Sequence, residues 1–194
     1  MESLSDEKLV QMVLDGDREV FSVLISRYER QIYGLAYRLT NNKHEAQDLG
    51  QEAFIKIYQS LGKYDPGRPF FSWMYKVAAN QCYSILRKKR EAETPLESVI
   101  EFVSDDHEEE NSPEQFILKK ENQDTVRRAL VSLPEKYRMA LILRFMEDMS
   151  YQEIADTMEI SLSAVESRIH RGKKLLLKSY QEERGELDGQ GKIE

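Results

Sequence analysis

The sequence predicts an all-α protein in which two small helical domains are joined by a flexible acidic linker, with a helix-turn-helix in the second domain. Apolar residues recur at three- and four-residue spacing almost throughout the 194 residues, and this period is typical of amphipathic helices rather than strands. Residues 91–118 contain ten acidic residues and no Lys or Arg. Such a segment can bury little apolar surface, so it favours a linker. Residues 151–172 show the pattern of two short helices joined by a tight turn.

Four helices are expected in the first domain, which we place at residues 1–90. Ser5 can cap the first helix, Gly16 suits the left-handed position that ends it, and Asp17 can cap the second. Asn41-Asn42 separates the second helix from the third. Residues 62–69 contain two prolines and two glycines, so they are expected to form a loop. The fourth helix is then expected to start near Ser72 and to run to residue 90.

The acidic linker is placed at residues 91–112, either as a solvated spacer or as a segment with a specific role. Ser112 and Pro113 form a helix-start signal. In the second domain, residues 113–182, helices are expected at about 113–132, 134–147, 150–158 and 161–182. The rest of the chain, residues 183–194, is expected to be a flexible tail.

Composition excludes several classes of protein. No apolar run is long enough to cross a bilayer, and the acidic start does not resemble a secretory signal. The single cysteine, Cys82, allows no internal disulfide. We therefore expect a cytoplasmic protein without membrane insertion. The three histidines lie far apart, and neither a phosphate-binding loop nor a metal-ligand spacing occurs. No enzyme, catalytic residue, metal or cofactor is expected.

The helix-turn-helix is the strongest local pattern. Its apolar positions can pack the two helices together, and Ser161 or Ser163 can cap the second helix. The positions expected to point outward, as in a helix that reads a major groove, are Ser163, Ala164, Glu166, Ser167, His170 and Arg171. An ordinary helical hairpin with a solvated basic face is the alternative. Glu159 stands in the turn, where many such motifs use Gly to reach a left-handed conformation.

Segments of both domains, together with this motif, resemble the corresponding segments of a known family. Residues 133–138, 149–155 and 165–172 resemble the C-terminal domain of extracytoplasmic-function sigma factors of the sigma-70 family. Residues 45–56 resemble that family's polymerase-binding helix. Residues 71–80, with the basic cluster at 87–90, resemble its −10 recognition and melting helix. The resemblance covers roughly residues 5–178. It implies that residues 1–90 are sigma region 2, that 113–182 are sigma region 4, and that the protein directs promoter-specific transcription initiation in a stress response.

The resemblance assigns residues to two surfaces of the first domain. The polymerase-binding surface is Asp48, Gln51, Glu52 and Ile55, which share one helix face; the alternative is a solvated polar stripe. The surface for −10 DNA combines aromatic and basic side chains, as single-stranded bases and their backbone require. Its members are Lys63, Arg68, Phe70, Phe71, Trp73, Lys76, Asn80, Arg87 and Lys88. Part of Trp73 and most of Val77 are expected to be core, and Cys82 is expected to be a buried small residue.

The resemblance also assigns the −35 DNA contacts to the second domain: Ser163, Ser167, Arg168, His170, Arg171, Lys173 and Lys174. Arg171 can bond guanine through two hydrogen bonds, and Lys173 and Lys174 can neutralise phosphates. Glu166 departs from the family pattern, where Lys or Arg is common, so its contact with a base stays open.

The implied partners are core RNA polymerase, promoter DNA and an anti-sigma factor. The linker would thread the polymerase's positively charged channel. The net charge of −7 is then compatible with DNA binding, because polymerase supplies much of the affinity. Two other classes remain as alternatives. A DNA-binding regulator without polymerase leaves the first-domain surfaces unexplained, and a helical adaptor that binds only protein makes the basic clusters incidental.

Overall fold

The computed structural model describes residues 4–93 and 123–190, and every regular element in those two ranges is a helix. The first domain contains α1 (Asp6–Leu14), the 3-10 turn η1 (Arg18–Val20), α2 (Phe21–Thr40), α3 (Lys43–Ser60), the 3-10 turn η2 (Leu61–Lys63) and α4 (Phe70–Glu93). The second contains α6 (Gln123–Ser132), α7 (Glu135–Phe145), α8 (Tyr151–Met158) and α9 (Leu162–Gln190). The all-α fold class is confirmed.

Local sequence signals place most helix ends of the first domain. The Ser5 hydroxyl accepts a hydrogen bond from the amide of Lys8 at 3.4 Å and caps α1. Gly16 has a φ of +111°, a backbone conformation that is strained for a residue with a side chain but that Gly adopts readily. The Asn42 side chain accepts from two amides at the start of α3. Asp17 is the exception, because it makes no side-chain capping bond and leads into η1 rather than directly into α2.

Three predicted boundaries differ from the structure. Helix α4 begins at Phe70, two residues before Ser72, and continues through residues 91–93, which the sequence assigned to the linker. Helix α9 runs to Gln190, past the predicted end at residue 182. The extension begins with Glu183, which pairs with Arg128 on α6 at 2.7 Å. Predictions for residues 94–122 and 191–194, including most of the acidic linker, lie outside the described residues.

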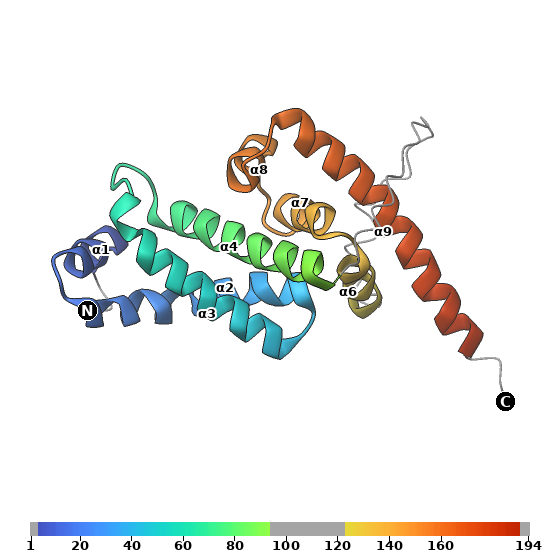
Figure 1. Cartoon of the computed structure of the whole chain (residues 1–194), viewed down its shortest axis with the longest axis horizontal. Helices are drawn as coiled ribbons and strands as arrows, with labels where there is room; N and C mark the ends of the chain where they lie inside the picture. Colours follow the sequence, from blue (N-terminus) through green and yellow to red (C-terminus); the bar gives the residue numbers. More distant parts are fainter. Residues whose placement is uncertain (1–3, 94–122, 191–194) are drawn as a thin grey trace.

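The two domains pack against each other. Helix α4 contacts α7 and α8, and α2 contacts α6 and α7. Figure 1 shows α6, α7 and α8 between the first domain and the long helix α9. The helix-turn-helix therefore lies against the same helix that carries most of the predicted −10 residues. In the described ranges, no helix is both long and apolar enough to cross a membrane.

Candidate nucleic-acid and polymerase interfaces

The helix-turn-helix is built by α8, a turn and the first turns of α9. Ser150 and Glu153 form a reciprocal capping box at the start of α8: each side chain bonds the backbone amide of the other residue. The Glu153 carboxylate accepts from both the amide and the hydroxyl of Ser150, and these two bonds lower the pKa of that carboxyl. Glu159 ends α8 in the left-handed conformation, with φ 54° and ψ 47°. The turn therefore has the backbone geometry that Gly adopts most easily, at a cost of about 1–2 kcal/mol for a residue with a side chain.

Ser161 starts the recognition helix. Its hydroxyl accepts from the amide of Ala164 at 3.2 Å, which decides between the two capping serines that the sequence left open. The apolar positions of the motif pack the two helices together, as expected, and the buried ones are Ile154, Ala155, Met158, Val165 and Ile169. Close approach of α9 to α7 is possible because residue 172 is Gly; a Cβ there would lie 3.1 Å from a carbon of Leu141.

The outward face of α9 holds most of the predicted −35 residues. Its exposed members are Ser163, Glu166, Ser167, His170, Arg171 and Lys174. Arg168 and Lys173 are half-buried. The Nη1 atom of Arg168 is buried without a hydrogen-bond partner in the protein. Arg171 therefore presents a more accessible guanidinium than Arg168.

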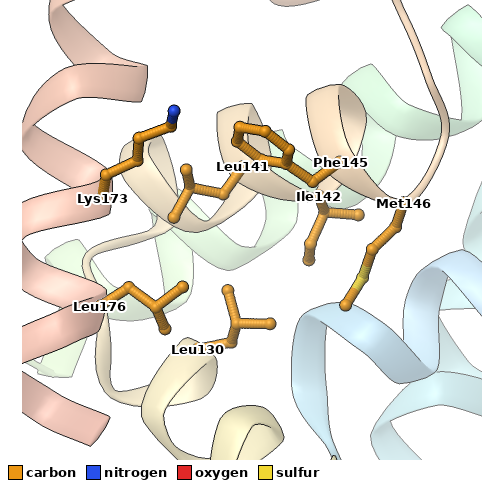
Figure 2. Close-up of a pocket in the computed structure, with 7 residues that line it drawn as sticks. All are labelled: Leu130, Leu141, Ile142, Phe145, Met146, Lys173 and Leu176. Carbon is orange, nitrogen blue, oxygen red and sulfur yellow. The ribbon is translucent and has the colours of Figure 1, made fainter. Parts of the chain in front are cut away.

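Lys173 lies at the edge of an apolar cavity between α6, α7 and α9. Figure 2 shows its side chain among Leu141, Phe145 and Leu176. The ammonium lies 5.0 Å from the centre of the Phe145 ring, a cation–π distance. The cavity measures about 10 Å³, which is about the space that one water needs. It is thus a packing defect rather than a ligand site.

Helix α3 presents the four predicted polymerase-binding residues on one exposed face: Asp48, Gln51, Glu52 and Ile55. Ile55 is 50 % exposed, although its neighbours Ala53 and Ile57 are buried. Tyr58, at 37 % exposure, continues this face by one helical turn and packs edge-on against Phe21 at 5.1 Å. Tyr58 is not among the predicted polymerase-binding residues, although its three-residue spacing from Ile55 is a signal that places it on the same face.

An aromatic cluster lies at the start of α4. The Phe70 ring contacts those of Tyr28, Tyr64 and Trp73, with ring centres 6.0, 5.3 and 5.8 Å apart. Phe70 is only 1 % exposed, so the structure contradicts its predicted direct contact with DNA. Its buried ring is the one against which the rings of Tyr28, Tyr64 and Trp73 pack. Phe71 is 42 % exposed, and Trp73 is half-buried, as expected for a ring that is partly core.

The loop before α4 is shaped by its own polar groups. The Asp65 carboxylate accepts from the amide of Gly67 at 2.9 Å, and the Tyr64 hydroxyl donates to the Arg68 carbonyl at 2.6 Å. Burial is the largest of the causes that raise the pKa of the Tyr64 phenol, followed by the charges of nearby carboxylates. These bonds hold the loop folded while its basic side chains, Lys63 and Arg68, remain exposed.

The remaining predicted −10 residues follow along α4. Lys76 and Asn80 are half-buried, whereas Arg87 and Lys88 are exposed. Cys82 lies on the opposite, core side at 0 % exposure. Burial raises the pKa of its thiol to about 12, so the group stays protonated and unreactive at neutral pH. Its prediction as a buried small residue is confirmed. Val77, predicted as core, is half-buried and packs against the core.

Comparison with known proteins places these surfaces in a family. The sequence pattern of sigma-70 region 2 matches residues 24–92, and that of sigma-70 region 4 matches residues 123–176. The RNA polymerase sigma-H factor of Pseudomonas aeruginosa is 36 % identical, over 91 % of this chain and 94 % of that protein. The ECF RNA polymerase sigma factor SigW of Bacillus subtilis is 32 % identical, over 91 % and 97 %.

Solved structures show the same fold. The sigma factor RpoE of Bartonella quintana, solved with the anti-sigma factor NepR, matches with a TM-score of 0.58 at 19 % identity, over 83 % of this chain and 96 % of that one. CnrH, solved with the cytosolic domain of CnrY, matches with a TM-score of 0.57 at 22 % identity, over 89 % and 95 %.

Two helical modules, one carrying a helix-turn-helix and the other an exposed polar helix beside an aromatic and basic surface, define a DNA-binding transcription protein. The chain belongs to the extracytoplasmic-function RNA polymerase sigma factors of the sigma-70 family. It acts in promoter-specific initiation of transcription by RNA polymerase.

Proposed function

We propose a division of labour between the two domains of this sigma factor. Residues 1–90 bind core polymerase and recognise and melt the −10 element, residues 113–182 read the −35 element, and residues 91–112 connect them. The observation that carries this proposal is the exposed face of the recognition helix, centred on Arg171, together with a separate exposed face on α3. The protein acts in the cytoplasm and has no catalytic role.

The −35 contacts divide by chemistry. Arg171 and Ser167 are exposed and near the start of α9, where a recognition helix meets base edges. His170 is also exposed on this part of α9 and is assigned to the base edges as well. Ser163 lies in the first turn and suits a phosphate. Lys174 also suits a phosphate, whereas Arg168 and Lys173 contribute from half-buried positions. Whether Glu166 accepts a hydrogen bond from a cytosine amino group is a question for promoter variants.

The −10 contacts combine stacking and charge. Phe71 and Trp73 offer ring surface to an unpaired base, and the exposed cations that follow the backbone are Lys63, Arg68, Arg87 and Lys88. Lys76 and Asn80 lie between these groups on α4. Flipping a base out of the duplex costs a few kcal/mol, which such a surface must recover.

The partners follow from the same surfaces. The face of α3 formed by Asp48, Gln51, Glu52 and Ile55 binds core polymerase. It mixes two carboxylates, an amide and an exposed isoleucine, a combination that suits an interface with a basic and apolar partner. An anti-sigma factor is a further proposed partner, because both solved relatives described above were captured with such a partner or with a cytosolic domain of another protein.

Polymerase binding is tested by co-purification of core polymerase with the tagged wild-type chain and with Ile55→Lys. The variant places a buried positive charge in the proposed interface, so we expect at least a tenfold loss of affinity. Gln31→Lys is the matched control, since it adds the same charge at an exposed position on α2. Equal binding by all three proteins would show that the α3 face is not the polymerase site.

A further inference from the structure

The interface between the two domains contains a buried arginine. The Arg138 side chain is 8 % exposed, and its guanidinium donates to the carbonyls of Val131 at 2.6 Å and Leu133 at 2.8 Å in its own domain. A third bond crosses to the first domain and ends on the carbonyl of Leu39, near the end of α2. One charged group thus joins the α6–α7 corner to the end of α2.

A second contact joins the same helices. Arg38, on α2, forms an ion pair with Glu147, which follows α7. Tyr75, on α4, is 2 % exposed; burial and the neighbouring Glu147 carboxylate raise the pKa of its phenol, so it stays neutral. A third pair, Arg90 with Glu135 at 3.1 Å, crosses from α4 to α7 at the rim. We call the Arg38–Glu147 pair and the Arg138 bond to Leu39 the interdomain latch.

The latched arrangement does not fit a promoter. The −10 and −35 elements lie about 25 base pairs apart, which is roughly 85 Å of straight duplex at 3.4 Å per base pair. Helix α4, with 24 residues, is only about 36 Å long. Helix α8 packs directly on α4, and the recognition helix starts within a few residues of α8. The two DNA-reading helices are therefore too close together to reach both elements at once.

Some buried polar atoms in the interface have no hydrogen-bond partner, and this weakens the contact enough to make it suitable for reversible opening. The Nε atoms of Arg38 and Arg138 are buried without a hydrogen-bond partner in the protein, and such atoms reduce the stability of a contact. Beside the latch lies an open cleft of about 400 Å³, lined by Leu86 and Lys89 from one domain and by Val131 and Leu133 from the other. The contact between the domains is thus specific but incompletely packed.

We infer that the interdomain latch holds the free sigma factor in a closed state, and that binding to core polymerase must break the Arg38–Glu147 and Arg138–Leu39 contacts before both promoter elements can be read. The inference rests on the proposed division of labour between the domains. Only open molecules bind polymerase, so the apparent affinity equals the affinity of the open form multiplied by the fraction of molecules that is open. Variants that weaken the latch should therefore bind polymerase at lower concentration.

The test is a charge-reversal cycle on the full chain, read by energy transfer between dyes at Ser26→Cys on α2 and Gln181→Cys on α9. Both positions are exposed, whereas the native Cys82 is buried. Arg38→Glu and Glu147→Lys should each lower the transfer efficiency of the free protein, and the double reversal should restore it. In transcription titrations, each single variant should reach half-saturation at about three- to tenfold less polymerase, and the double variant should return to the wild-type value.

Arg30→Glu is the matched control, since it makes the same charge change at an exposed position of α2 and should leave the transfer efficiency unchanged. If a reversal reduces helicity by circular dichroism, Glu147→Gln replaces it, because that change removes the charge but keeps the shape. Unchanged efficiency in folded single variants, or a double variant that behaves as the sum of the singles, would overturn the inference. Because energy transfer needs neither polymerase nor DNA, a closed protein that supports no promoter-selective transcription would refute the proposed function and leave the latch standing.

Discussion

At the scale of single residues, Arg171 carries the most specific prediction. Its guanidinium is exposed on the recognition helix and can bond guanine through two hydrogen bonds. Arg171→Ala should cost about 1–3 kcal/mol of −35 binding, or roughly 5- to 150-fold. The measurement is transcription from matched promoters with intact and altered −35 sequences. Arg184→Ala is the control on the same helix, beyond the region 4 match. If both alanine variants lose activity equally, Arg171 does not read the −35 element.

Trp73 is the residue that should separate melting from initial binding. Its half-buried ring lies 5.4 Å from that of Tyr64 and 5.8 Å from that of Phe70. Trp73→Ala should remove about 1–3 kcal/mol of stacking on an unpaired base, while −35 contacts remain. We expect a larger loss in open-complex formation, measured by permanganate reactivity, than in closed-complex binding. Equal losses in the two steps would contradict this role. A thermal melt of the variant controls for the lost packing.

Arg138 should contribute to stability through its three carbonyl contacts. Lysine keeps the charge but cannot direct donors to all three oxygens. Arg138→Lys should therefore lower the free energy of unfolding by about 1.5–3 kcal/mol, the range for hydrogen bonds that involve a charged group. Urea denaturation measures the loss, and Arg30→Lys, at an exposed position, should change it little. An unaltered midpoint in the Arg138 variant would mean that water replaces these contacts at no cost.

Residue-scale prediction from the sequence succeeds where helical period decides exposure. Ile55 is an example, because the spacing of its apolar neighbours places it on the outer face of α3. It fails for Phe70, which stands beside a Pro/Gly loop and a cationic segment but turns inward. The direction of that ring depends on Tyr28, a residue more than forty positions earlier in the chain, and no local pattern contains that information.

At the scale of elements, the capping box of α8 makes a pH-dependent prediction. The folded protein lowers the pKa of Glu153 from its ordinary value of 4.5, through bonds from the Ser150 amide and hydroxyl. The ionised carboxylate therefore adds stability above about pH 4.5, and this stability is lost as the pH falls through the lowered pKa. Glu153→Gln should be less stable than wild type at pH 7, and the difference should shrink under acid conditions. A difference that is independent of pH would exclude the carboxylate as its source.

The other half of the capping box can be tested alone. Ser150→Ala should cost about 1 kcal/mol, the usual value of such a cap, measured by thermal or urea unfolding. Ser72→Ala is a suitable control, since Ser72 is an exposed serine inside α4 rather than at its cap. The cap interpretation fails if the two alanine variants are equally stable.

Element ends are predictable where a side chain or a special backbone conformation marks them. Ser5, Gly16 and Ser150 all did so. The C-terminal end of α9 could not be placed this way. Its final turns look polar in the sequence, but Tyr180 is buried and Glu183 pairs with Arg128 on α6, and this tertiary packing accompanies the longer helix.

At the scale of the whole molecule, the order of the two domains follows from their motifs, but their packing does not. The latch joins Leu39 to Arg138 and Arg38 to Glu147, pairs about 100 residues apart in the chain. One sequence does not reveal which distant charges meet. The net charge of −7 is compatible with the proposed DNA binding only at this scale, because polymerase is expected to supply much of the binding energy.

The proposal that this chain directs polymerase to promoters through two separate DNA-reading helices can be tested on the purified protein. The most direct measurement adds the purified protein to core RNA polymerase with a library of promoters randomised around −10 and −35, followed by sequencing of transcript starts. We expect transcription to become selective for a subset of promoters with preferred bases at both elements. Arg171→Ala should relax the preference at −35 alone. Transcription no more selective than that of core polymerase without the protein would show that the chain does not direct promoter selection in this way.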